Sequence, residues 1–465
     1  MQKAMAEPHL SDLPFLVKQH LRKHGIQPET GPTDVKDMRA EVTLLRDTFG
    51  LVQVFFRSDT LLDLEKIQRQ TGRKLEPLTT LDIDRIKAKL SVNTLPAFDD
   101  LVDAETLIDE RLFQAEDFFV HSGNSDKLIR VRNGAELKHR DSTRILDLCV
   151  DLPGALPDID DLGVFAHDQV EIDRAVTSFT ALRIRQRLSE TLEIPPLSET
   201  AQSIIRLRAD PDADITKLSR IVEKDPSLAA QVVSWASSSY YAAPGSIKSV
   251  QDAIVRVLGY DLVMNLALGL ALGKTLDMPD DQPEGFSSYW TRAVFVAATC
   301  GALLAKIPRE FRPGFGLVYL TGLLHNFGYL ILAHAFRPHF SATCRMMESN
   351  RHLPHQHIEQ HLLGITGDQI AAALLHYWKM PNEVCLGIRY QVEPHYQGAH
   401  ADHAQLVYLA NHLLQKHGLL PGAEQEFDPA VYDYLHLDPE EAEDAIQEIR
   451  DARDQLAIIV QGLES

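Results

Sequence analysis

The run Leu317-Val-Tyr-Leu-Thr-Gly-Leu-Leu-His325-Asn326-Phe-Gly328-Tyr-Leu-Ile-Leu-Ala333 decides the fold of the larger part of this chain. It is almost wholly apolar, and its only strongly polar side chains are the adjacent pair His325 and Asn326. A buried imidazole and a buried amide need hydrogen-bond partners or a metal ion. The run therefore predicts a helix at the centre of a long helical segment, with a polar pair that is either a working site or the remains of one.

The composition is that of a soluble globular protein with more than one domain. A chain of 465 residues is too long for one ordinary core, and it is 45% hydrophobic and 24% charged. No stretch approaches the roughly 20 unbroken apolar residues of a membrane span, and the N-terminus lacks the apolar core of a signal peptide. The four cysteines show no Cys-x-x-Cys spacing, which argues against a cysteine-based zinc site. We expect a cytoplasmic protein without a membrane partner.

The net charge of −20 is distributed unevenly. Residues 1–150 carry 22 Lys and Arg against 25 Asp and Glu, which leaves 24 against 41 for the remainder. So acidic a surface repels phosphate backbones, which argues against nucleic-acid binding by the C-terminal two thirds. The near-neutral first part leaves a contact with tRNA open.

Residues 1–150 combine helical and strand patterns. Leu13 to His24 has helical spacing and stops at Gly25, a typical C-cap. The runs 42–46 and 51–56 are β-type and are joined by a short turn at 47–50, while 127–132 alternates apolar and basic residues. Helices are expected at 61–71 and 82–90. These patterns predict an α+β domain.

The order of these elements resembles the YbaK family of aminoacyl-tRNA deacylases, also called prolyl-tRNA editing domains. The matching pieces are His24-Gly25, Leu62-Asp-Leu-Glu-Lys66, Ile108-Asp-Glu-Arg-Leu112 and Val120-His-Ser-Gly123. Active members of the family carry a lysine at the start of the first core strand, where this chain has Glu41 or Val42. The glycine-rich substrate loop of the family falls at 91–96, which contains no glycine. The resemblance therefore implies a degenerate YbaK-like module kept for binding or docking.

The remainder of the chain has a helical pattern. A Pro-, Gly- and Asp-rich stretch at 152–161 marks a boundary, and 170–192 is expected to form a connecting helix. Asp214 and the pair Asp225-Pro226 are typical helix N-termini. We expect an α+β YbaK-like domain (1–150), a linker with a connecting helix (151–193), an all-α domain (194–420) and a helical tail (421–465).

The all-α part is similar to the HDOD domain, an output domain of bacterial signalling proteins related to the HD phosphohydrolase superfamily. The matching pieces are Pro196-Leu197, Glu223-Lys-Asp225-Pro226-Ser-Leu228, Ala236-Ser-Ser238 and Ile247 to Gly259. The frame Leu323-Leu-His325-x-x-Gly328 resembles the helix that carries the His-Asp pair in HD enzymes. That pair holds metal ions, but the second position here is the neutral amide of Asn326.

The other metal ligands implied by the resemblance are missing too. The early histidine aligns with Thr291-Arg292, a histidine of the relatives that cleave cyclic dinucleotides aligns with Gln369, and their paired histidines fall near 389–391. The last carboxylate aligns with Asn411. With one ligand in about six retained, we expect no catalytic residue, no metal and no cofactor. We expect a vestigial pocket that is either collapsed around hydrogen bonds or binds a small anion through Arg292; its residues are Arg292, His325, Asn326, Gln369 and Asn411.

Two further patterns leave alternatives open. His352, His355, His357 and His361 form either a metal patch or a solvated, mildly pH-sensitive surface, and we favour the surface. A final helix from Asp438-Pro439 to about Gly462 carries an apolar stripe that must pack on its own domain or on a second copy of the chain.

The leading hypothesis for function is a non-enzymatic signalling or regulatory scaffold with protein partners. The resemblances leave two enzymatic alternatives: a metal-dependent HD-type phosphohydrolase or cyclic-dinucleotide phosphodiesterase, and an aminoacyl-tRNA deacylase acting through the N-terminal domain.

Overall fold

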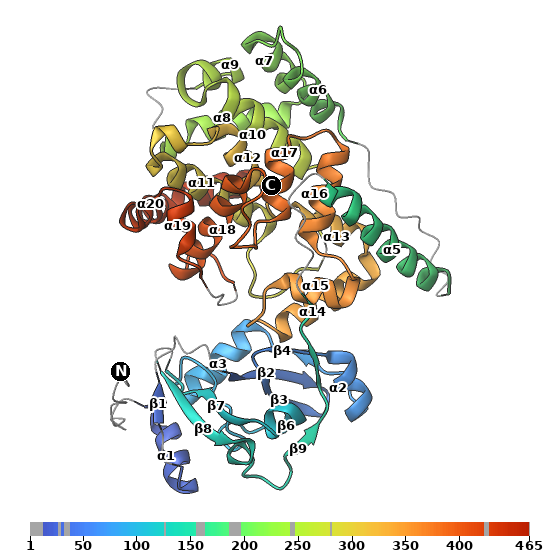
Figure 1. The fold of residues 1–465 in the computed structure, drawn as a ribbon, viewed down its shortest axis with the longest axis vertical. Helices are drawn as coiled ribbons and strands as arrows, with labels where there is room; N and C mark the ends of the chain where they lie inside the picture. Colours follow the sequence, from blue (N-terminus) through green and yellow to red (C-terminus); the bar gives the residue numbers. More distant parts are fainter. Residues whose placement is uncertain are drawn as a thin grey trace. The chain divides into compact units, whose positions relative to one another are not determined.

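The computed structural model describes residues 13–26, 29–31, 38–124, 127–154, 163–185, 197–241, 247–279, 281–422 and 427–464. The chain forms two compact units (Figure 1). The N-terminal unit contains residues 1–154, 283–285 and 341–361, and the helical unit contains 155–282, 286–340 and 362–465. The segment 341–361, far along the sequence, thus belongs to the N-terminal unit.

A mixed sheet forms the centre of the N-terminal unit. Its strands run in the order β1-β8-β7-β2-β3-β6-β9, and β5 pairs with β2. The β2–β3 hairpin closes with Asp47 opposite Gly50, which confirms the predicted turn. Residues Ile129 and Val131 of β8 are buried and Arg132 is exposed, as the alternation predicts. The strands are β1 (Glu29–Gly31), β2 (Arg39–Asp47), β3 (Gly50–Arg57), β5 (Glu76–Pro77), β6 (Glu105–Asp109), β7 (Glu116–His121), β8 (Leu128–Asn133) and β9 (Arg144–Leu146).

The helices of this unit are α1 (Phe15–His24), α2 (Leu64–Thr71), α3 (Thr80–Leu90), α4 (Glu110–Phe113), most of α14 (Arg337–Ser349) and most of α15 (His355–Leu363). Gly25 and Gly72 end α1 and α2 in the left-handed conformation, with φ of 68° and 71°, as expected for C-caps. The predicted helix start at Leu61 is wrong. Residues Thr60–Leu62 form β4, which pairs with β10 (Cys149–Asp151), because Leu61 and Leu62 are fully buried in the extended conformation.

The second unit is helical throughout its described part. Asp214 and Asp225 cap α7 and α8, with Oδ1 accepting from Lys217 N at 2.7 Å and from Leu228 N at 3.0 Å. The predicted linker at 152–161 and the predicted end of the connecting helix at Leu192 lie mostly outside the described residues. The helices are α5 (Gly163–Arg185), α6 (Glu199–Arg208), α7 (Ile215–Glu223), α8 (Pro226–Ser237), α9 (Val250–Ala253), α10 (Tyr260–Gly273), α11 (Tyr289–Lys306), α12 (Phe315–Leu324), α13 (Phe327–Ala335), α16 (Gly367–Tyr377), α17 (Asn382–Arg389), α18 (Ala401–Lys416), α19 (Ala430–Tyr434), α20 (Pro439–Asp451) and α21 (Arg453–Glu464).

The apolar central run is two helices, α12 and α13, interrupted at His325 and Asn326. This corrects the expectation of one uninterrupted helix. The segment Phe315–Ala335 is long and apolar enough to cross a membrane by length and composition, so the expectation that no stretch approaches a span was too strong. However, 78% of its most apolar window is buried inside the fold, which is typical of a core helix of a globular protein.

The C-terminal tail also differs from the expected single helix, because Ala452 separates α20 from α21. The predicted apolar stripe is buried in the core of the helical unit, where α20 and α21 both pack on α11. The stripe therefore lies against its own unit. Its buried members are Ala442, Ile446, Ile449, Leu456 and Ile459.

Candidate functional site

The helix junction at His325 is held by short contacts with neighbouring backbone. His325 Nδ1 lies 2.7 Å from Gly322 O, and Asn326 Nδ2 donates to Tyr289 O at 3.2 Å. A Cβ atom on Gly328 would lie 2.1 Å from Gly367 O, so the glycine of the Leu-Leu-His-x-x-Gly frame is required by the close approach of α13 to α16.

A buried acid, Asp168 of α5, lies at the centre of the polar groups beside this junction. Its Oδ1 accepts from Gln369 Nε2 at 2.9 Å and from Arg389 Nη2 at 3.2 Å, and Arg389 Nε donates to its Oδ2. The side chains of Asp168 and Arg389 are 0% and 1% exposed. This is a bidentate ion pair in the interior. Removing either partner would leave the other charge buried and unpaired, which is strongly destabilising.

A second set of bonds connects this ion pair to the junction. Gln391 Nε2 lies 2.7 Å from His325 O and 2.7 Å from Asp368 Oδ1. Asp368 precedes Gln369 in the first turn of α16, where the Gln369 side chain also accepts from Thr366 N in a capping box. We call Asp168, His325, Asp368, Gln369, Arg389 and Gln391 the HD-type cluster.

Arg292 and Asn411 form a separate contact between α11 and α18. Arg292 Nη2 donates to Asn411 Oδ1 at 3.2 Å, and its Nη1 donates to Pro421 O at 3.2 Å. Burial lowers the pKa of Arg292 to about 10, because the charged guanidinium loses solvation. No described carboxylate lies within ion-pair distance of Arg292.

The five residues singled out from the sequence are thus distributed over three local contacts. Arg292 bonds Asn411, Gln391 and Asp368 connect His325 with the turn of Gln369, and Asn326 bonds the backbone of α11. The central acid, Asp168, was missed because the connecting helix was expected to begin at 170, whereas α5 begins at Gly163. The buried pair Val164 and Phe165 just before it is an apolar signal that could have revealed the earlier start.

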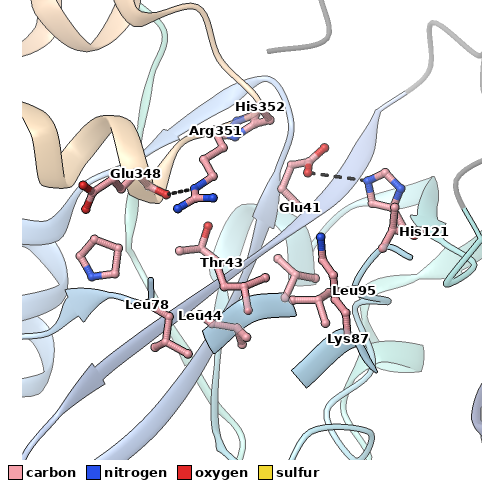
Figure 2. A pocket seen from close by; sticks show the side chains of 14 residues that line it. Glu41, Thr43, Leu44, Leu78, Lys87, Leu95, His121, Glu348, Arg351 and His352 are labelled. Carbon is pink, nitrogen blue, oxygen red and sulfur yellow. Dashed lines mark hydrogen bonds and ion pairs between the residues drawn. The ribbon is translucent and has the colours of Figure 1, made fainter. Parts of the chain in front are cut away.

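The N-terminal unit contains a pocket of about 200 Å³ above β2 (Figure 2). Its walls come from β2, α3, the loop at 94–95, the end of β7 and residues 348–352. We call it the β2 pocket; it is lined by Glu41, Val42, Thr43, Leu44, Pro77, Leu78, Ile83, Lys87, Thr94, Leu95, His121, Glu348, Arg351 and His352.

The polar groups of the β2 pocket carry both signs of charge. Glu41 and His121 approach to 3.7 Å, and Arg351 Nη1 donates to Thr80 Oγ1 at 3.1 Å. Burial alone would raise the pKa of Glu41, but the hydrogen bond with His121 and the charge of His352 lower it below the usual value. The half-buried Lys87 forms no hydrogen bond with any described residue, and Figure 2 shows its ammonium group directed into the pocket.

This pocket coincides with the position at which the YbaK resemblance places its substrate. Glu41 and Val42, one of which the resemblance aligns with the strand lysine of the family, both line the pocket, and the glycine-free loop contributes Thr94 and Leu95. An amine is nevertheless present, because α3 supplies Lys87. Lys87 was not predicted from the sequence, because the resemblance places the family's lysine on the first core strand and not on a helix.

The four histidines at 352–361 differ in exposure, and the side chains of His355 and His361 are 42% and 25% exposed. These histidines are half-buried, and His352 packs its ring against Phe56, with centroids 5.3 Å apart, and places Nε2 3.3 Å from Thr60 O. Burial lowers the pKa of His352 and of His357, because the imidazolium form is poorly solvated there.

Comparison with known proteins supports both halves of this architecture. The HDOD domain profile matches residues 194–394, and the aminoacyl-tRNA editing domain profile matches 39–138. A crystal structure of a protein from Marinobacter aquaeolei VT8, provisionally assigned to signal transduction, is 40% identical, with a TM-score of 0.85 over 98% of this chain and 100% of that chain.

Two more distant similarities were found. An HDOD domain protein of unknown function from Geobacter sulfurreducens is 20% identical over 63% of this chain and 99% of its own, with a TM-score of 0.49. An uncharacterized protein from Treponema pallidum is 23% identical over 227 residues, which are 48% of this chain but only 41% of that protein. From the two profiles and the full-length match, this chain belongs to the HDOD-domain proteins that carry an N-terminal YbaK-like, aminoacyl-tRNA editing fold.

Proposed function

We propose that the chain is a non-enzymatic signal-transduction scaffold of the bacterial cytoplasm, which acts through protein partners rather than through a metal-dependent reaction. The observation that carries this proposal is the ion pair of Asp168 with Arg389. The carboxylate oxygens that a divalent cation would need are bonded to a guanidinium and to an amide of the same chain.

Electrostatics supports this reading of the HD-type cluster. An HD enzyme requires several ligands with open positions for water around one or two cations. A cation placed beside Arg389 would be repelled by it and would have to break a buried ion pair, which costs roughly 3–5 kcal/mol when one partner is removed. Asn326 supplies no compensating charge, because an amide is neutral.

Hydrolysis assays on the purified full-length chain test this proposal. With Mn²⁺, Fe²⁺ or Mg²⁺ present, we expect the wild type to cleave cyclic dinucleotides and nucleotide phosphates no faster than the matched His325→Ala variant. The variant must retain the circular dichroism spectrum of the wild type. Turnover that disappears in His325→Ala would show that the HD-type cluster is catalytic and would overturn the proposal.

A second candidate function, aminoacyl-ester binding or hydrolysis, is favoured by one observation in the β2 pocket: the amine of Lys87 has no partner among the described residues. Glu41 could accept the α-ammonium group of an aminoacyl ligand, while Lys87 and Arg351 could face its carbonyl or carboxylate. A volume of about 200 Å³ suits a ligand of amino-acid size rather than a larger one.

Lys87→Met and the matched control Lys89→Met separate binding from catalysis, because Lys89 is exposed on the same helix and does not line the pocket. Losing one charge-assisted hydrogen bond should weaken the binding of free amino acids by about tenfold in Lys87→Met only, measured by calorimetry. Deacylation of mischarged tRNA that is lost in Lys87→Met and kept in Lys89→Met would make this unit an enzyme and refute the scaffold.

A further inference from the structure

Three histidines from distant parts of the N-terminal unit meet outside the β2 pocket. His20 and His24 lie one turn apart on α1, and His139 follows the 3₁₀ turn Gly134–Leu137. Their ring centroids are 4.6 Å (His20–His24), 4.8 Å (His20–His139) and 3.7 Å (His24–His139) apart. One ring nitrogen of each lies within 4.8 Å of the others, and this is the one such group of three among the described residues.

Asp100 orients two of these rings, and Asp99 lies beside the third, whose Nδ1 has no hydrogen-bond partner among the described residues. Asp100 contacts Nδ1 of His20 and accepts from Nε2 of His24 at 3.0 Å. Asp99 lies 3.5 Å from Nδ1 of His139 and is itself fixed by Thr143 Oγ1 at 2.6 Å. A carboxylate that bonds one ring nitrogen fixes the tautomer in which the other nitrogen has a free lone pair, the arrangement found behind metal-bound histidines.

The second ring nitrogen of His20, Nε2, has no bonding partner in the described part of the chain. His20 is 3% exposed, and its Nε2 is buried without a hydrogen-bond partner among the described residues. An imidazole ligates a metal through a ring nitrogen that bears no proton, and a buried nitrogen without a partner is placed to do so.

We propose that His20, His24 and His139 bind one divalent transition ion of the zinc class. Neutral imidazoles suit Zn²⁺, Ni²⁺ and Cu²⁺. Around a tetrahedral zinc, ligand nitrogens at 2.0–2.1 Å from the ion lie roughly 3.3 Å apart, so the rings need only close inward. His24 and His139 are half-buried, so an ion can reach these rings from solvent.

Binding at this site would fasten α1 to the loop after Phe98 and to the segment at 139. His20 already stacks on Phe98, with centroids 4.2 Å apart, so the ion would lock a contact that exists without it. A ligand that binds only the folded state raises its stability. The site shares no residue with the HD-type cluster or the β2 pocket. A test of metal binding here is therefore independent of the proposed function.

Metal titration of the untagged, chelator-stripped full-length chain tests the site. We expect one equivalent of Zn²⁺ to bind in competition with a chromophoric chelator, Co²⁺ to give the absorption of a four-coordinate ion, and Zn²⁺ to raise the Tm of the N-terminal unit. Asp100→Asn should weaken binding by roughly ten- to a hundredfold, because it removes the orienting charge.

Three variants decide between this site and other histidines. His24→Ala and His139→Gln should each lose the equivalent of Zn²⁺, while the control His357→Ala, which breaks the other His-x-x-x-His pair of this unit, should keep it. His24 is half-buried at the end of α1, so its truncation tests the site with the least risk to folding. Zn²⁺ retained in both ligand variants, or lost in His357→Ala, would overturn the proposal.

Discussion

The HD-type cluster and the β2 pocket use their charged groups in opposite ways. In the helical unit, both carboxylate oxygens of the buried Asp168 are bonded to the side chains of Arg389 and Gln369. In the N-terminal unit, the cation Lys87 lines a cavity and has no described partner.

The two places differ in whether the charged group is already paired within the chain. Once a carboxylate and a guanidinium are buried as a pair, removing either partner leaves the other charge alone in the interior and costs several kcal/mol. The ammonium group of a half-exposed lysine at a pocket wall stays hydrated, so it needs no partner within the chain. The first arrangement holds helices together, and the second leaves a charged group accessible at a pocket wall.

The largest expected effect comes from breaking the buried pair. Asp168→Ala should destabilise the helical unit by about 3–5 kcal/mol, because it strands the guanidinium of Arg389 in the interior. Urea denaturation of the full-length chain, monitored for the transition of this unit, measures the change. The double variant Asp168→Leu with Arg389→Met should recover most of it, since no charge is then left unpaired.

An exposed ion pair on the same helix is the matched control. Arg174 Nη1 and Glu171 Oε1 are 2.8 Å apart, but the Arg174 side chain is 69% exposed. Glu171→Gln should therefore change stability by only about 0.5 kcal/mol or less. Equal losses in Asp168→Ala and Glu171→Gln would mean that the HD-type cluster is not held by its buried charges.

A second, smaller effect concerns the glycine of the HD frame. Gly328→Ala places a methyl group against the backbone of Gly367, which cannot move as a side chain can, and should cost about 1–3 kcal/mol or more. Gly462→Ala in α21 meets no atom within 4 Å and should instead add about 0.5–1 kcal/mol. Thermal unfolding of both variants checks the sign; a neutral Gly328→Ala would show that α13 and α16 have room to separate.

Many local features of the fold could be predicted from short sequence patterns. The caps at Gly25, Asp214 and Asp225 and the hairpin at 47–50 were predictable because each depends on residues only a few positions apart. Both family resemblances were likewise visible in short motifs. The helix break at His325 was not predictable, because it follows from packing against α11 and α16 rather than from local propensity.

The candidate sites were less accessible to sequence reasoning. Asp168 and Arg389 are 221 positions apart, and Lys87 reaches the pocket from a helix rather than from the expected strand. The pair His20 and His24 did carry a local signal, the His-x-x-x-His spacing on one helix face. Its third member, His139, could be placed beside them only by the tertiary fold.

The smallest expected effect concerns pH and the wall of the β2 pocket. Burial holds the pKa of His352 below its usual value near 6.5, although the charge of Glu41 opposes this shift. Because the folded-state pKa is the lower one, His352 contributes stability above about pH 6.5 and loses it as the pH falls. His352→Gln keeps an N–H donor for Thr60 O but cannot titrate.

Between pH 7 and 5.5 the N-terminal unit of the His352→Gln variant should lose less stability than that of the wild type, by up to about 1 kcal/mol. Urea midpoints at the two pH values measure this difference. Parallel losses would mean that the His352 imidazole is solvated in the folded chain and that burial does not lower its pKa.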